Sequence, residues 1–128
     1  LNELVSQSLE IADFTDGAGT SGYIDLDTTL PALAMVLGWK AVVSEGFAGD
    51  THAVISVGVN GDTDKYSAIT TCSVLAAGTV GALMNTDNAI ASTAQTVRVT
   101  VTGDADFTSI VTNNTGIMVV TLYYFIAH

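Results

Sequence analysis

The segment TVRVTVT, residues 96–102, alternates apolar and polar side chains without a break. Successive side chains of a strand point to opposite faces of its sheet. We therefore expect the three Val side chains to face a core, and Arg98 and the Thr side chains to face water. This segment predicts a half-buried β-strand and indicates the fold class of the whole chain.

The same signal recurs on both sides of this segment. Strands are predicted at residues 23–27, 52–59, 66–77 and 115–128 and in the apolar stretch 34–43, where Trp39 is the expected core anchor. In that stretch we expect Met35 to share the face of Trp39, and Val36 to lie on the other face. Gly, Asn or Asp separates each segment from the next, as is typical of turns. Seven or eight strands at this spacing predict an all-β, antiparallel β-sandwich that is jelly-roll-like.

The composition fits one β domain. The chain has 128 residues, of which 48% are hydrophobic and only 12% are charged. A chain of this length buries enough surface for one core. The lone Cys72 cannot form an intramolecular disulfide. We divide the chain into an N-terminal arm at residues 1–10 and a single β-sandwich domain at residues 11–128.

The two ends of the sequence predict an interaction surface. The arm, LNELVSQSLE, spaces its apolar residues as a short helix would, and we expect it to become ordered by docking. The last segment, TGIMVVTLYYFIAH, is apolar on both faces, so one face needs a cover. That cover is a partner chain, which predicts a homo-oligomer, or the arm of the same chain. The residues expected at the interface are Leu4, Val5, Leu9, Met118, Val120, Leu122, Tyr124 and Ile126.

The charge excludes one class of partner. Thirteen acids against three Lys and Arg give a net charge of −10. Such a surface repels phosphate backbones, so no nucleic-acid partner is expected. No apolar run approaches the ~20 residues that cross a bilayer, so no membrane partner is expected either.

No catalytic site is predicted. The two His residues, His52 and His128, lie in no recognisable motif, and Cys72 lies mid-segment among Thr and Ser, as a small buried thiol would. We therefore expect no enzyme, no cofactor and no metal. The pairs of Asp residues, such as Asp62 and Asp64, fit turns, although calcium binding by this pair stays open.

A carbohydrate-binding module is an alternative reading. Sandwiches of this size can bind sugars on an aromatic platform. Aromatic residues make up only 7% of the chain, and Trp39 is expected in the core. An exposed Tyr23 or Tyr66 could still bind a sugar.

Several segments together resemble the small β-sandwich proteins that decorate or cement the heads of tailed phages. They are the N-terminal arm, DLDTTLPALAMVLGWKAVVSEGF (residues 25–47), AVISVGVNGDTDKYS (residues 53–67) and TGIMVVTLYYFIAH (residues 115–128). The likeness spans most of the chain, but it is one of pattern, which phage tail or head fibre and receptor-binding domains share.

This resemblance implies a structural protein of a bacteriophage virion. A capsid decoration or cement protein of this kind is expected to form a homotrimer on the outer capsid surface and to bind the major capsid protein. Assembly in the host cytoplasm is expected. The acidity of this chain departs from what an acidic shell would favour and leaves the contact surface unassigned.

Overall fold

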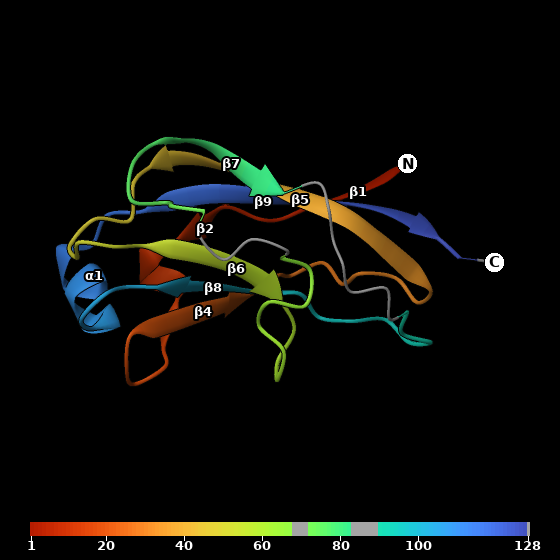
Figure 1. Cartoon of the computed structure of the whole chain (residues 1–128), viewed down its shortest axis with the longest axis horizontal. Helices are drawn as coiled ribbons and strands as arrows, with labels where there is room; N and C mark the ends of the chain where they lie inside the picture. The colour runs from red at the N-terminus through yellow and green to blue at the C-terminus, as the bar shows by residue number, and fades with distance from the viewer. Residues whose placement is uncertain (68–71, 83–89, 128) are drawn as a thin grey trace.

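The computed structural model describes residues 1–67, 72–82 and 90–127. Within these residues two antiparallel sheets face each other (Figure 1). Sheet A has the strand order β1-β9-β5-β7, with β2 also paired to β9, and sheet B has the order β3-β4-β8-β6. The strands of sheet A are β1 (Asn2–Val5), β2 (Leu9–Glu10), β5 (Ala34–Glu45), β7 (Gly78–Ala82) and β9 (Ile117–Ile126). The strands of sheet B are β3 (Thr15–Asp16), β4 (Ser21–Asp25), β6 (Val54–Gly58) and β8 (Arg98–Thr102).

The chain crosses repeatedly between the two sheets. From β4 onward, each successive described strand lies in the sheet opposite to the one before it. Alternate strands therefore contribute their inward side chains to one shared core. The predicted all-β sandwich is confirmed, whereas its description as a jelly roll stays a prediction.

The core lies between the sheets, and its largest side chains are fully buried. Trp39 is the expected anchor and has no exposed surface. The three Val side chains of the 96–102 segment are also fully buried, as predicted, whereas Thr100, which was expected to face water, is buried as well. Other fully buried side chains come from both sheets and from the loops between them: Leu9, Leu30, Phe47, Ile55, Val57, Val74, Phe107, Ile110, Met118 and Leu122.

A β-bulge in β5 changes the predicted parity of that strand. Val36 pairs with Tyr124 and Gly38 pairs with Tyr123, so Leu37 is an extra residue in the ladder. An extra residue reverses which side chains face the core. Trp39 therefore points inward as predicted, but Val36 is buried and Met35 is exposed, the opposite of the prediction.

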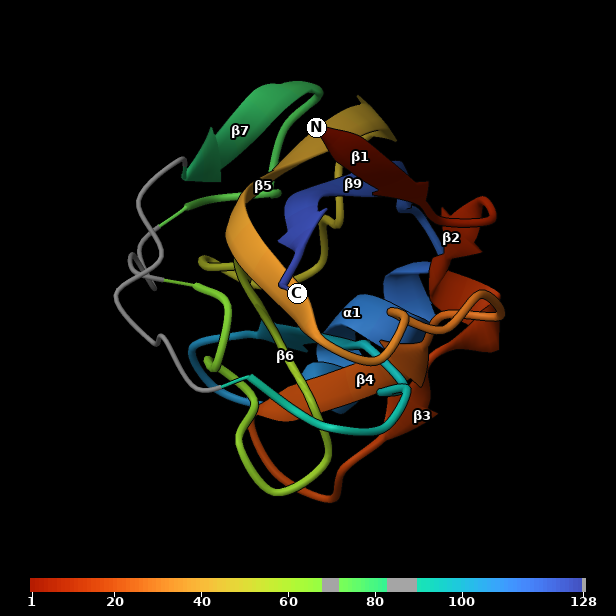
Figure 2. The same ribbon diagram turned by 90° about the vertical axis from the view of Figure 1, so that its right-hand side faces the viewer.

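One end of the sandwich is closed by the helix α1 (Phe107–Asn113), in a segment where no helix was predicted. The Asp106 side chain caps the helix by accepting from the Thr108 N–H, and Asn114 ends it in the left-handed conformation. Figure 2 shows α1 between the two layers. A Cβ at Gly22 would lie 2.1 Å from the Phe107 ring, so only Gly lets β4 and the helix approach so closely.

The N-terminal segment also differs from the prediction. Residues 1–10 form no helical arm, because β1 and β2 pair with β9 and belong to sheet A. A 3-10 turn, η1 (Ile11–Asp13), then leads into sheet B.

The predicted strand at residues 66–77 is not found in its described part. There, Cys72 and Val74 bond to the backbone of β6 and its flank, and residues 68–71 lie outside the described residues. The next strand of sheet A is β7, which begins at Gly78.

Candidate functional site

The expected interface residues are mostly inside the sandwich. Leu4 pairs with Leu122, and Leu9 pairs with Met118, all on the inner face of sheet A together with Val120. The structure therefore brings both ends of the sequence together within one chain. Their own chain covers these five side chains, so they present no surface to a partner.

The three remaining interface residues lie elsewhere. Tyr124 and Ile126 are partly buried and pack against the core, and Val5 points outward. The sequence left open that the last strand lies centrally under the N-terminal arm of its own chain. β9 is central in sheet A, but the arm pairs beside it as β1 and β2 and does not cover its outer side.

The outer side of sheet A carries the largest exposed apolar side chains of the sheets. Val5, Met35, Val42 and Phe125 are each between 41% and 52% exposed. Met35 pairs directly with Phe125, and Val42 pairs with the outward Val119. We call the outward side chains of Val5, Met35, Val42 and Phe125 the apolar face. The Leu37 bulge hid Met35 from the sequence prediction, because it reverses the parity there.

Charges are sparse around the apolar face. From Val119 to Phe125 of β9, the outward positions and their paired neighbours carry charge only at Glu3 and Lys40. The molecule as a whole has a net charge of −10, so this face is an almost neutral area of an acidic protein. Exposed apolar areas with few charges are typical of protein contacts.

The outer side of sheet B is polar. Arg98 donates to both carboxylate oxygens of Asp25, at 2.8 and 3.2 Å, and to the Asn60 side-chain oxygen at 3.1 Å. Its guanidinium carbon lies 3.8 Å from the centre of the Tyr23 ring. The hydrogen bond to Asp25 raises the pKa of Arg98, and the guanidinium stays charged.

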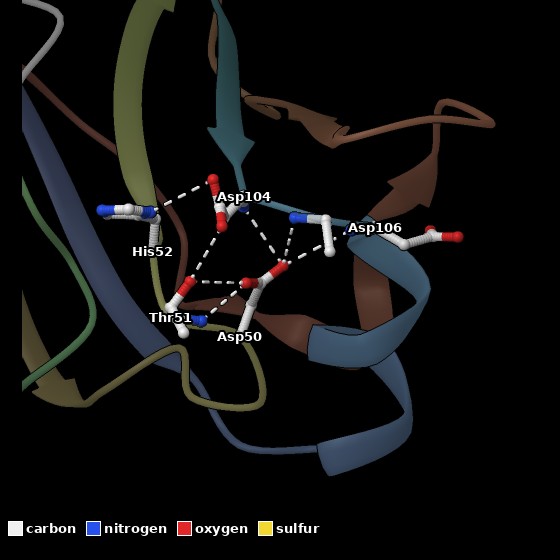
Figure 3. Close-up of polar contacts among 6 residues, drawn as sticks. Asp50, Thr51, His52, Asp104 and Asp106 are labelled. Atoms are coloured by element: carbon white, nitrogen blue, oxygen red, sulfur yellow. Dashed lines mark hydrogen bonds and ion pairs between the residues drawn. The ribbon is translucent and has the colours of Figure 1, made fainter.

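A polar cluster holds the loop between β8 and α1. One Asp50 carboxylate oxygen accepts the backbone N–H groups of Asp104, Ala105 and Asp106, at 3.1, 3.0 and 3.4 Å. The other accepts the N–H of Thr51 at 2.6 Å. The bonds from Ala105, Thr51 and Asp106, the one from Ala105 foremost, lower the pKa of Asp50 to about 2. Figure 3 shows this cluster.

The same cluster orients a second carboxylate. The Thr51 hydroxyl lies 3.3 Å from Asp50 Oδ1 and 3.2 Å from Asp104 Oδ2. His52 Nδ1 lies 3.5 Å from the other oxygen of Asp104. His52 and Asp104 are 63% and 61% exposed, so their groups are accessible to a ligand.

A pocket of about 350 Å³ lies beside this cluster. It is lined by three hydroxyl side chains, an imidazole, two carboxylates and one apolar side chain. These come from β6, from the end of β8 and from the loops that flank them: His52, Val54, Ser56, Thr63, Asp64, Thr102, Gly103 and Asp104.

The other residues considered from the sequence form no catalytic arrangement in the described part of the chain. Cys72 is half-buried, with its Sγ 3.8 Å from the Gly81 carbonyl oxygen, and His128 lies outside the described residues. Among residues 1–67, 72–82 and 90–127, no three His, Cys, Asp or Glu side chains cluster as metal ligands would.

The two tyrosines considered for sugar binding are both at least partly covered. Tyr66 is buried, and Arg98 lies over the ring of Tyr23.

No helix in the described residues is long and apolar enough to span a membrane.

Comparison with known proteins finds a solved structure with a similar fold. No protein-family model matches the sequence, and no curated protein matches it. Among solved structures, the chain is similar to a chain described as "Cyanophage Pam1 capsid asymmetric unit", with a TM-score of 0.50 and 17% sequence identity. The match covers 98% of this chain and 86% of that chain. The two chains are therefore of similar length and share one fold from end to end.

Proposed function

We propose that this protein is a structural component of a bacteriophage capsid, of the decoration or cement type, and not an enzyme. The observation that carries the proposal is the likeness of fold to a chain of a cyanophage capsid over 98% of the present chain. A protein with this role needs no catalytic residue. Its work is to occupy a repeated position on the shell of the virion and to hold neighbouring subunits together.

The apolar face supports this proposal, because it is the part of the described surface best suited to a protein contact. Its four side chains extend along three strands of sheet A, and sheet hydrogen bonds hold them in fixed positions. A rigid apolar surface binds with little loss of conformational freedom. We propose that it forms the contact with the major capsid protein or with neighbouring copies in a homotrimer.

The proposed location follows from the same arrangement. Many weak contacts on a repeating lattice add up to tight attachment. The protein would assemble in the host cytoplasm, bind on the outer capsid surface and turn the polar outer side of sheet B toward solvent. A tail or head fibre domain is the competing assignment, and it would be present in few copies.

Copy number tests the proposal. We expect quantitative mass spectrometry of purified virions to give a ratio to the major capsid protein near a simple fraction of one, corresponding to hundreds of copies. A few copies per particle would favour a fibre domain, and absence from the particle would overturn the proposal.

A binding experiment tests the apolar face. The double variant Val42→Ser, Phe125→Ser removes exposed apolar surface from sheet A, whereas the control Val111→Ser removes it from α1. We expect the first variant to bind capsids lacking this protein at least tenfold more weakly and the control to bind normally. Equal binding of both variants would exclude this face as the contact.

A further inference from the structure

The pocket beside β6 and β8 is separate from the apolar face. Val54, Ser56 and Thr102 line it from sheet B, on the side away from the core. The apolar face is on the outer side of sheet A, across the sandwich. A ligand in the pocket would therefore be accessible while sheet A is covered by another protein. The volume of about 350 Å³ lies at the lower end of the range for small-molecule sites.

One wall of the pocket is held in place before any ligand arrives. Asp50 binds three consecutive N–H groups of the loop that carries Asp104, and Thr51 contacts the Asp104 carboxylate. Asp104 is thus fixed by its backbone and by its side chain. Fixed polar groups bind better than mobile ones, because less conformational entropy is lost on binding.

The lining offers both hydrogen-bond donors and hydrogen-bond acceptors. The Ser56, Thr63 and Thr102 hydroxyls can each donate and accept, and the Asp64 and Asp104 carboxylates accept. A ligand that has many hydroxyl groups satisfies both kinds of partner. Val54 adds an apolar side chain that can contact the C–H groups of a ring.

Thr100 is a buried hydroxyl residue on β8, one of the two strands that line the pocket, although it does not line the pocket itself. Thr100 pairs with Ser56 and lies two residues before Thr102, on the same side of sheet B as both. It is only 7% exposed, yet its Oγ1 has no hydrogen-bond partner among the described residues. Buried polar groups without a partner are rare and costly.

The negative charge of the pocket disfavours anionic ligands. Asp64 and Asp104, within a protein of net charge −10, disfavour phosphates, nucleotides and acidic sugars. No metal-binding cluster occurs among the residues that the structure describes. We propose that the pocket binds a neutral saccharide, with Asp64 and Asp104 accepting from ring hydroxyls. The Ser and Thr hydroxyls of the pocket complete the contacts.

The test uses the full chain and arrays of neutral, acidic and amino glycans. We expect binding confined to neutral glycans, with dissociation constants that titration calorimetry can measure. Asp104→Asn and Asp64→Asn keep the size of each side chain but remove a charged acceptor. Each should weaken binding about tenfold or more. Asp27→Asn is the matched control, because Asp27 is an exposed acid beyond the far end of β4, and it should bind as the parent does.

Three results would overturn the proposal. One is the absence of binding to every neutral glycan at millimolar concentration. Another is equal loss in Asp27→Asn and the pocket variants, which would indicate a general effect of charge. The third is preferred binding of polyamines or amino glycans, which would make the pocket a site for cations. The Val42→Ser, Phe125→Ser variant should keep full glycan binding, so this test is independent of the capsid contact.

Discussion

The outer sides of sheet A and sheet B come from strands of the same sandwich, but they differ in how they meet solvent. On sheet B, Arg98 is held by Asp25 and Asn60 and covers the Tyr23 ring, so long side chains satisfy one another. On sheet A, Phe125 and Met35 face outward as a pair without such polar cover.

The comparison shows that the apolar residues of a single strand can be present for two separate reasons. Alternate side chains of β9 point inward and belong to the core, as Leu122 does. The side chains between them point outward, and Phe125 is 47% exposed. The inward set is explained by folding alone. The outward set is the part that a partner would explain.

The largest expected effect separates these two sets on β9. Leu122→Ala removes a fully buried side chain and should lower the free energy of unfolding by about 2–5 kcal/mol. Tyr123→Ala, the next residue on the outward side, should cost clearly less, because Tyr123 is only partly buried. Chemical denaturation of both variants measures the difference. Equal losses would mean that the outer side of sheet A contributes to folding as the core does.

A smaller effect is expected on the outer side of sheet B. Asp25→Asn leaves the Arg98 side chain, which is only 15% exposed, without its anionic partner. The loss in the free energy of unfolding should be about 1–3 kcal/mol. The exposed neighbour Asp27 provides the control, since Asp27→Asn should change stability by less than about 0.5 kcal/mol. Similar values for the two variants would show that the polar cover of sheet B adds nothing.

The polar cluster beside sheet B should make stability depend on pH. The folded pKa of Asp50, about 2, is below its ordinary value of 3.8, so its contribution is present above pH 3.8 and is lost as the pH falls toward 2. Asp50→Asn should remove this part of the pH dependence. Melting temperatures from pH 6 to pH 2 measure it, and parallel curves for the parent and the variant would contradict the assignment.

The smallest effect is expected on the apolar face itself. Met35→Ser should change the unfolding free energy of the isolated protein by less than about 0.5 kcal/mol, because Met35 is 41% exposed and lies outside the core. The same variant should weaken protein contacts through sheet A. Denaturation in dilute solution checks the first statement, and a loss above 1 kcal/mol would assign Met35 to the fold.

Where a strand keeps a regular alternation, the sequence predicts its faces correctly. In β8 the three Val side chains face the core as the pattern of residues 96–102 predicts, although Thr100 on the other side is buried too. Trp39 was identified because a large aromatic side chain in an apolar strand has few places other than a core. The sandwich as a fold class follows from many such segments separated by turn residues.

The remaining features depend on contacts that a local pattern does not contain. The bulge at Leu37 is one extra residue, and only its pairing with β9 shows it. β1 becomes a strand because β9 offers it an edge, although its spacing resembles a helix. Asp50 lies 54 residues from Asp104, so their cluster has no short-range signal. For α1 the sequence did offer two signals. Asp106 is a residue type that caps the start of a helix, and Asn114 is one that tolerates the left-handed conformation at its end.

The pairing of β1 with β9 also sets how the molecule would respond to mechanical load. Asn2 lies opposite Tyr124, and the two ends of the chain emerge on one side (Figure 1). Hydrogen bonds of an antiparallel pair run across the strands, so tension applied at these two residues would open the bonds one at a time. Tension between Glu45 and Ile126 would pull β5 and β9 along their length and load all their bonds together. The sandwich is therefore expected to peel at a low force along its first pair of strands and to resist shear along the next.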